Sequence, residues 1–209
     1  MKHIADIKPR WAEHLPEPPR WRSDGEGVMI DTPWMRVTRH PAVAPTGMDA
    51  DYVVMRPKNV GTGVLPLHDD GTVVLVGQHR FTLMRYSWEM PEGGAPMDED
   101  PFDAVRRELA EEAGLRADHW RAALDMDLSN SITDERAMTW VAWGLSPVPV
   151  DPDPTEVIVA ARVPFRDLLA EIERGAVRDS MTVATAYKAY HMAREGELPA
   201  ALARAMLGA

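Results

Sequence analysis

The sequence predicts an α/β fold of the α+β kind, in which helices cover both faces of a mixed β-sheet. Two observations support this fold class. Strand-like runs of apolar residues occupy the first half of the chain, and a helical period replaces them near residue 100. Strand-like runs then return and are followed by helical patterns. This order favours a sheet between helical layers.

The bulk composition narrows the classes of function. The 209 residues suffice for one sizeable core and are few for two ordinary domains. A net charge of -10 argues against a sequence-independent nucleic-acid binder, which needs excess lysine and arginine. The lack of cysteine excludes disulfides and a cysteine nucleophile. Because no apolar run approaches the ~20 residues of a spanning helix, we expect a cytoplasmic protein without membrane contact.

Residues 1–26 have the composition of an arm. Their prolines and tryptophans are Pro9, Trp11, Pro16, Pro18, Pro19 and Trp21. Proline at that density favours extended chain over helix. A tryptophan-bearing arm packs against its own domain or a second subunit. We therefore expect an N-terminal arm over 1–26, able to form dimer contacts, and one domain over 27–209.

Strand-like segments follow the arm. Apolar or alternating runs occupy residues 35–40, 52–55, 60–67 and 72–76, and later 138–143 and 156–163. The runs 60–67 and 72–76 flank Asp69-Asp70-Gly71. An Asp-Gly turn between two apolar runs predicts a β-hairpin.

The clearest helix is predicted over residues 101–113. Asp100 suits the N-cap, Pro101 the first helical position, and Gly114 the C-terminal stop. Apolar side chains recur between them at helical spacing. Later helical patterns cover residues 165–174, about 181–194, and 199–207.

This helix carries three glutamates on one face. Glu108, Glu111 and Glu112 are three and four residues apart, so their carboxylates lie together. Like charges at that spacing cost only about 0.2–0.5 kcal/mol per pair, which a solvated surface tolerates. Ion pairs of Arg107 with Asp103 and Glu111 would suit such a surface. The helix alone therefore leaves two interpretations open, a salt-bridged surface and a metal site.

The segment before the helix favours the metal site. Pro91-Glu92-Gly93-Gly94 ends a strand-like run, and we expect there a backbone that only glycine adopts easily. Such a loop can aim a main-chain carbonyl at a cation while the helix supplies carboxylate oxygens. Oxygen ligands with open positions suit Mg²⁺, or Mn²⁺, which keep waters and bind substrate phosphates.

Residues 93–115 resemble the Nudix box. That motif is a glycine, five residues, Glu, seven residues, Arg-Glu, an aliphatic, any residue, Glu-Glu, any residue, Gly and an aliphatic. The matching positions are Gly93, Glu99, Arg107, Glu108, Leu109, Glu111, Glu112, Gly114 and Leu115. Seven fixed letters coincide by chance about once in 10⁸ windows at roughly 7% usage per residue type. The resemblance implies a Nudix fold, an αβα sandwich with a mixed β-sheet.

The resemblance also implies roles. Glu108 and Glu112 would bind Mg²⁺ directly, and the backbone carbonyl of Glu92 would be a further ligand. Glu111 would be a ligand or would hold metal-bound water, which makes it a catalytic candidate. Arg107 would orient these glutamates. The implied reaction is attack of water on a phosphorus of a nucleoside diphosphate linked to another group.

The segment before the box indicates which subgroup of the family the chain resembles. Residues 77–80 followed by 87–94 are similar to ADP-ribose and nucleotide-sugar pyrophosphatases. There the arginine matching Arg80 contacts the diphosphate, and the glutamate matching Glu89 assists the site. Without that role Arg80 would be a surface arginine at a strand end. The expected activity is hydrolysis of an NDP-sugar or ADP-ribose to a nucleoside monophosphate and a sugar phosphate.

A catalytic base is expected after the box. ADP-ribose members often carry a Pro-Gly pair there, whereas this chain has Ser-Asn-Ser at 129–131, similar to other nucleotide-sugar hydrolases. Glu135 matches the glutamate that GDP-mannose-type members use as a base or metal ligand. Glu156 is the alternative, at the place where ADP-ribose enzymes hold theirs, in a loop that also fits a proline-rich acidic turn. We favour Glu135.

Subunits of this subgroup pair, and the N-terminal portion completes the neighbour's site, so we expect a homodimer. Trp34 would stack on the nucleobase or pack inside the dimer. Two other functions stay open. One is a Nudix pyrophosphatase that hydrolyses nucleoside triphosphates, although such enzymes usually lack the arm. The other is a Nudix-fold sensor that binds a nucleotide sugar without cleaving it, and such modules typically lose box glutamates.

Overall fold

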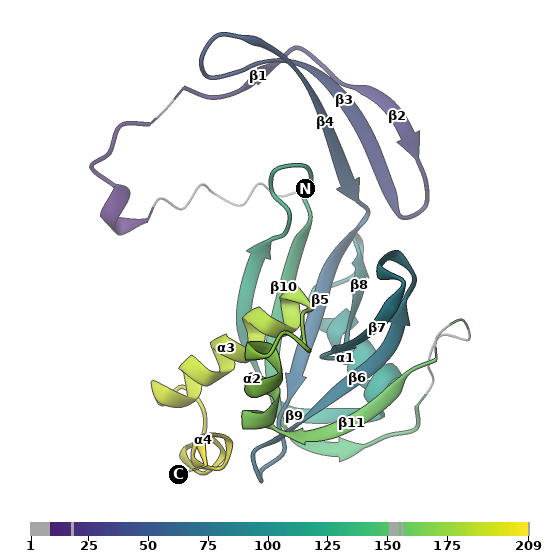
Figure 1. Ribbon diagram of the computed structural model, residues 1–209, viewed down its shortest axis with the longest axis vertical. Coiled ribbons are helices and arrows are strands. Elements are labelled where there is room, and N and C mark those ends of the chain that lie inside the picture. The colour runs from purple at the N-terminus through teal and green to yellow at the C-terminus, as the bar shows by residue number, and fades with distance from the viewer. Residues whose placement is uncertain (1–8, 18, 151–154, 156, 209) are drawn as a thin grey trace.

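The computed structural model describes residues 9–17, 19–150, 155 and 157–208. Within these residues the strands form three sheets, and helices lie on both sides of the central one (Figure 1). The predicted fold class, a mixed sheet between helical layers, is confirmed. Over the same residues, no helix combines the length and the apolar character needed to cross a membrane.

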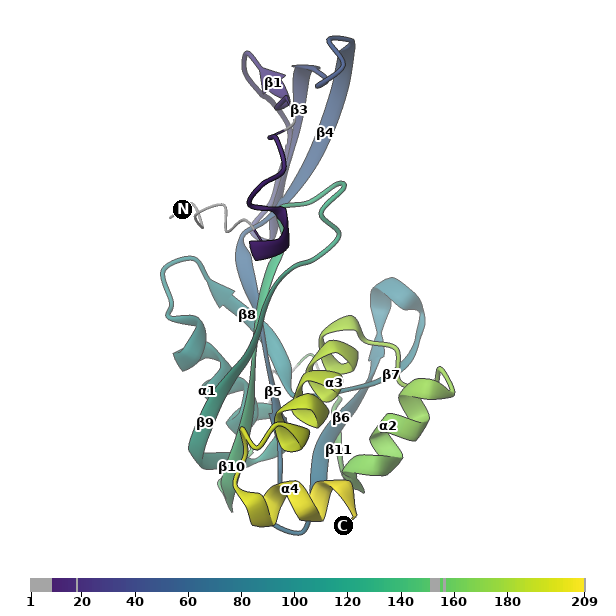
Figure 2. The ribbon, with the colours of Figure 1, turned by 90° about the vertical axis from the view of Figure 1, so that its left-hand side faces the viewer.

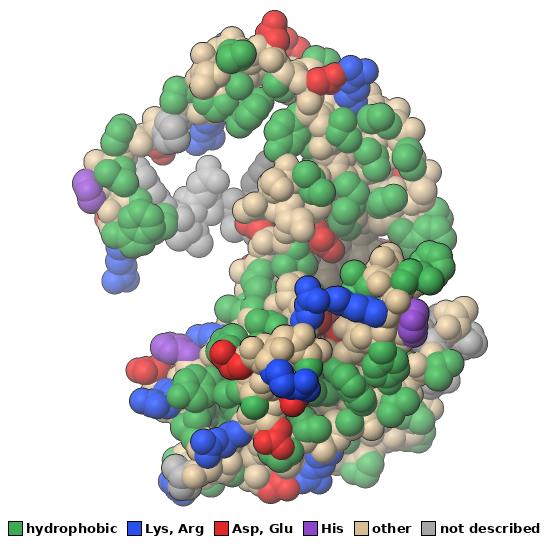
Figure 3. All heavy atoms as spheres, in the orientation of Figure 1, with side chains coloured by type: hydrophobic (Ala, Val, Ile, Leu, Met, Phe, Trp, Pro, Cys, Tyr) green, Lys and Arg blue, Asp and Glu red, His purple; other side chains and the backbone are tan. Residues whose placement is uncertain are grey.

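The first sheet projects from the rest of the molecule (Figures 1 and 2). Its strands are β1 (Arg22–Ser23), β2 (Gly27–Asp31), β3 (Met35–Val43) and β4 (Asp49–Pro57). β3 pairs antiparallel with the other three. Apolar side chains are exposed over this sheet (Figure 3), among them Val28, Met29, Ile30 and Val53.

Part of the expected arm packs against this sheet. A short 3-10 turn, η1 (Arg10–Ala12), precedes β1. Trp21 meets the ring of Tyr52 edge to face, with 5.4 Å between centroids. The described end of the arm therefore contacts its own chain.

The central sheet is mixed. Its strands are β5 (Asn59–Pro66), β8 (Glu92–Pro96), β9 (Leu115–Asp127) and β10 (Arg136–Pro147), in the order β8-β5-β10-β9. β5 and β10 run parallel, and the other two pairs are antiparallel. The third sheet is antiparallel, in the order β11-β6-β7, with β6 (Thr72–Arg80), β7 (Arg85–Glu89) and β11 (Val159–Pro164).

The projecting sheet is attached to the central sheet at two places. Only Lys58 separates β4 from β5. The loop between β9 and β10 also rises beside β4 (Figure 2). In that loop the Ser131 carbonyl accepts a hydrogen bond from Tyr52, and Asp134 pairs with Arg56.

The predicted helix is confirmed as α1 (Pro101–Ala113). The Asp100 carboxylate accepts the Phe102 N–H at 2.8 Å, and Gly114 ends the helix with a φ of 62°. The other helices are α2 (Phe165–Glu173), α3 (Ser180–Arg194) and α4 (Ala200–Leu207), close to their predicted bounds. A second 3-10 turn, η2 (Phe81–Leu83), joins β6 to β7.

Neighbouring residues of β5 point to opposite faces of the sheet and pack into different core clusters. Val64 packs with Val105 and Leu109 of α1. Leu65 belongs to the larger core cluster, which α2, α3 and α4 complete. This alternation follows from the two-residue period of a strand. It places α1 on one face of the sheet and the later helices on the other.

The predicted strands need correction in two places. The Asp69–Gly71 turn reverses the chain, with a φ of 80° at Gly71 and a bridge between Leu67 and Val73. The flanking strands then diverge, because β5 pairs with β8 and β10 while β6 pairs with β7 and β11, so the full hairpin is wrong. Strand β9 was not predicted at all.

Candidate active site

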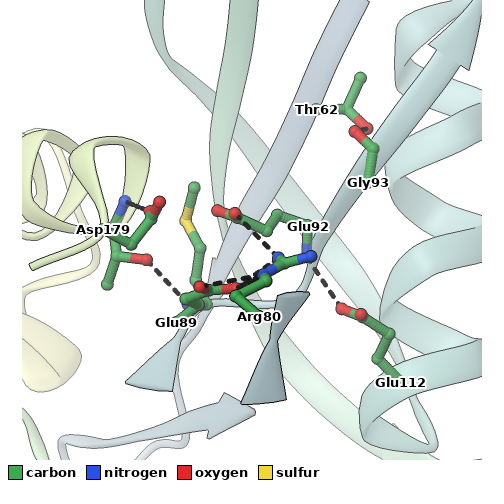
Figure 4. Close-up of polar contacts among 9 residues, drawn as sticks. Thr62, Arg80, Glu89, Glu92, Gly93, Glu112 and Asp179 are labelled. Carbon is green, nitrogen blue, oxygen red and sulfur yellow. Dashed lines mark hydrogen bonds and ion pairs between the residues drawn. The ribbon is translucent and has the colours of Figure 1, made fainter. Parts of the chain in front are cut away.

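The box joins helix α1 to strand β8. The Glu112 carboxylate accepts a hydrogen bond from the backbone N–H of Glu92 at 2.9 Å. Glu112 is buried, with 8% of its surface exposed. On the neighbouring strand the Thr62 hydroxyl donates to the Gly93 carbonyl at 3.2 Å. Figure 4 shows both contacts beside the helix. The box glutamate Glu112 is thus held against the backbone just before Gly93.

Arg107 gathers three of the box glutamates. Its Nη1 donates to Glu108 at 2.8 Å and to Glu111 at 3.0 Å, while its Nη2 donates to Glu99 at 3.3 Å. Partial burial works against the charge on Arg107, but the hydrogen bonds to Glu99 and Glu108 outweigh it and raise the pKa of Arg107. The guanidinium therefore stays charged and fixes the glutamate carboxylates.

The expected ion pair of Arg107 with Asp103 is wrong. Asp103 lies 3.6 Å from Arg106 instead. Arg107 points its planar fork toward the glutamates, where three carboxylates offer stronger attraction than one.

Gly93 is required for space rather than for backbone conformation. The expectation that Gly93 and Gly94 need a backbone peculiar to glycine is wrong, because both pair regularly with β5 and neither has a positive φ. A Cβ on Gly93 would lie 2.3 Å from Cδ of Glu108. A Cβ on Gly94 would lie 2.6 Å from Nδ2 of Asn59. The first box glycine therefore makes room for a box glutamate.

Arg80 and Glu89 form a second polar group. The Nε of Arg80 donates to both oxygens of Glu89, at 3.1 and 2.9 Å, and Nη2 also contacts Glu89. Nη2 reaches Oε1 of Glu92 at 3.4 Å. Two of the three residues predicted to bind substrate, Arg80 and Glu89, thus lie together, next to the start of β8 (Figure 4).

Asp179 joins this group, and the sequence did not single it out. Glu89, Glu92 and Asp179 each place a carboxylate oxygen within 4.8 Å of the others. Burial raises the pKa of Glu92 well above its usual value, and the charges of Asp179 and Glu89 raise it further. Asp179 caps α3 by accepting the Thr182 N–H at 2.7 Å. The spacing of Asp179 and Thr182 signals a helix start, but not the approach to β8.

The remaining predicted residues lie elsewhere. Trp34 is 75% exposed at the β2–β3 turn of the projecting sheet. The backbone of Glu135 is held in the β9–β10 loop by contacts with Thr133 and Leu128. Gly63 pairs with both Glu92 and Thr139, so Thr139 is the residue of β10 level with Glu92. Glu135 lies four residues before Thr139, which is roughly 13 Å along the strand direction. Glu156 lies outside the described residues.

Comparison with known proteins identifies the family. The family model of the NUDIX domain matches residues 57–183. The chain belongs to the Nudix family. The matched region begins at the last residue of β4 and reaches into α3, so it contains the box, Arg80, Glu89, Glu135 and Asp179.

Individual relatives of this Nudix chain match over shorter spans. An ADP-ribose pyrophosphatase of Mycobacterium tuberculosis is 35% identical over 86 residues, 41% of this chain and 42% of that protein. An RNA pyrophosphohydrolase of Bartonella henselae is 36% identical over 66 residues, 29% of this chain and 38% of that protein. These matches therefore span about two fifths of the length of each relative.

A solved structure supports the fold of this Nudix chain. An ADP compounds hydrolase superposes with a TM-score of 0.78 over 88% of this chain and 100% of the other, at 17% sequence identity. At that identity the likeness concerns the fold alone, and it agrees with the α+β Nudix architecture described above.

Proposed function

We propose that the chain hydrolyses the diphosphate of a nucleoside diphosphate sugar or of ADP-ribose, yielding a nucleoside monophosphate and a sugar phosphate. The observation that carries the proposal is the arrangement around Arg107. Its guanidinium holds Glu99, Glu108 and Glu111 together, while Glu112 is held against the backbone of Glu92. Nudix-fold sensors typically lose box glutamates, whereas this chain keeps all of them.

The donor chemistry of this set fits a divalent cation. Glu108, Glu111, Glu112 and the carbonyl of Glu92 offer oxygen ligands only, which suits Mg²⁺ and also Mn²⁺. When bound, such an ion neutralises phosphoryl oxygens and lowers the pKa of a coordinated water. The buried position of Glu112 supports this role, because a buried carboxylate needs strong partners.

The chain's own residues divide the remaining work. Glu89 occupies Nε and Nη2 of Arg80, which fixes the plane of the guanidinium. Among contacts of the described residues, the N–H groups of Nη1 are left for the diphosphate. Glu111, held by Arg107 at 3.0 Å, is proposed to orient the attacking water. Glu135 is retained as the proposed base and would have to approach the box when substrate binds.

A panel of potential substrates tests the proposal. The purified chain is incubated with Mg²⁺ and ADP-ribose, GDP-mannose, UDP-glucose, nucleoside triphosphates or an RNA with a 5′-terminal triphosphate, and the products are identified. The proposal expects a nucleoside monophosphate and a sugar phosphate. The 5′-triphosphate RNA is included because several relatives are RNA pyrophosphohydrolases.

Other outcomes would select the alternatives. Pyrophosphate release from nucleoside triphosphates alone would favour the triphosphate-cleaning enzyme. Tight binding of a nucleotide sugar without product would favour the sensor. Cleavage of RNA ends would contradict the expected absence of nucleic-acid substrates.

Three further expectations stay predictions. They are the homodimer, the cytoplasmic location and the division into an arm over 1–26 and a domain over 27–209. The exposed apolar residues of the projecting sheet support the homodimer, since such surfaces commonly mark contact sites. Under this proposal Trp34 would stack on the nucleobase or pack between subunits.

A further inference from the structure

A cluster of three carboxylates lies beside the box. Glu89 ends β7, Glu92 begins β8, and Asp179 precedes α3. One oxygen of each lies within 4.8 Å of the other two. The side chains of Glu89 and Glu92 are only 4% and 12% exposed. Figure 4 shows Asp179 on the helix side and Glu92 on the strand side, pointing toward one another.

The cluster holds more carboxyl groups than the one cation paired with it among the described residues can satisfy. Arg80 is hydrogen-bonded to both glutamates, mainly to Glu89. Asp179 directs its Oδ2 to the backbone N–H of Thr182, a neutral donor. Three carboxyl groups therefore share one guanidinium, and burying acidic groups without enough partners is unfavourable.

One oxygen of the cluster has no donor. Oε2 of Glu92 is fully buried and lacks a hydrogen-bond partner among the described residues. A buried carboxylate oxygen in a native protein normally accepts a hydrogen bond or binds a cation. This observation is independent of the clustering, and it points to a missing positive group.

We propose that Glu89, Glu92 and Asp179 bind a divalent cation, Mg²⁺ or Mn²⁺, distinct from any ion held by the box glutamates. The ligand atoms are all carboxylate oxygens, as these ions prefer. Oxygens bound to one Mg²⁺ at about 2.1 Å lie at most about 4.2 Å apart, so a small contraction of the cluster suffices. The open positions of the ion would hold water or an anionic ligand beside Arg80.

This cation site does not depend on the proposed reaction, because it is tested by metal binding. Mn²⁺ alone is titrated into the full chain, and bound ions per chain are counted from the electron paramagnetic resonance signal of free Mn²⁺. The Asp179→Asn variant should bind one ion fewer than the wild type. Asparagine still caps a helix, so α3 should remain intact. Glu92→Gln should lose the same ion.

Two controls locate the lost ion. Asp167→Asn removes an exposed acidic residue from the first turn of α2 and should leave the count unchanged. Glu112→Gln alters the box and should keep the cluster ion. Equal counts in the wild type, Asp179→Asn and Glu92→Gln would overturn the proposal. So would a count that falls only in Glu112→Gln. Neither result bears on the substrate panel, so failure of the site and failure of the proposed function are distinguishable.

Discussion

The carboxylate of Glu112 accepts the backbone N–H of Glu92 at 2.9 Å, and this contact ties the box helix to the strand before it. Glu112→Gln keeps an acceptor for that N–H but removes the negative charge. We expect the fold to persist and activity to fall by at least about 100-fold, since a metal ligand contributes several kcal/mol and each 1.36 kcal/mol is tenfold in rate. Steady-state rates with Mg²⁺ and urea unfolding measure the two effects.

Full activity in a folded Glu112→Gln protein would show that Glu112 is not a metal ligand. Glu112→Ala provides the comparison for stability. It leaves the buried N–H without its acceptor, so the free energy of unfolding should fall by about 1–3 kcal/mol.

Gly93→Ala should damage the site more than the fold. The added Cβ would meet the carboxylate of Glu108, the mobile end of a side chain, and push it from Arg107. We expect activity to fall at least tenfold, while the free energy of unfolding drops by about 1 kcal/mol, the low end for overpacking. Gly61→Ala is the matched control, because its Cβ meets nothing closer than 3.4 Å. Equal activities of the two variants would contradict the crowding argument.

Arg107→Lys should weaken Mg²⁺ binding although it preserves charge. A lysine ammonium cannot reproduce the fork that reaches Glu99, Glu108 and Glu111 together. Loss of such supporting contacts typically costs about 10–100-fold in metal affinity or activity. Isothermal titration with Mn²⁺ measures the affinity. The neighbouring Arg106→Lys, at an exposed position, should behave as the wild type, and a similar loss there would rule out a specific role for Arg107.

His68 predicts a pH dependence of stability. Burial lowers the pKa of His68 below 6.5, and the charge of Arg162 lowers it further. Between the folded pKa and 6.5 the unfolded chain binds more protons, so the free energy of unfolding falls as pH falls through that window. His68→Gln should reduce this fall in urea unfolding between pH 7 and 5. An NMR titration of His68 with a midpoint above 6.5 would reverse the sign.

Local signals made helix α1 and its glutamates predictable. Asp100 caps the helix and Gly114 ends it through contacts a few residues away, so their positions in the sequence suffice. The pairing of Arg107 with Glu111 is equally local. The box could therefore be interpreted before any tertiary contact was known.

Features that depend on distant contacts were not predictable. Asp179 reaches Glu92 because α3 packs beside the start of β8, although 86 residues separate them in the sequence. Within the described residues, strand β9 lies at the edge of its sheet and pairs with β10 alone, with a register shift at Thr139 and Trp140. A half-exposed edge strand with an irregular register shows no clean alternation. Crowding at Gly93 likewise depends on how closely Glu108 approaches.

The double attachment of the projecting sheet has a mechanical consequence. A sheet attached at one point can rotate about that point, whereas contacts at several points along a strand restrict its orientation. Lys58 links β4 directly to β5, and farther along β4 the Tyr52 hydroxyl and the Met55 N–H donate to carbonyls of the β9–β10 loop. These contacts favour one orientation of the sheet, so we expect a partner that binds the sheet to lose little conformational entropy at this junction.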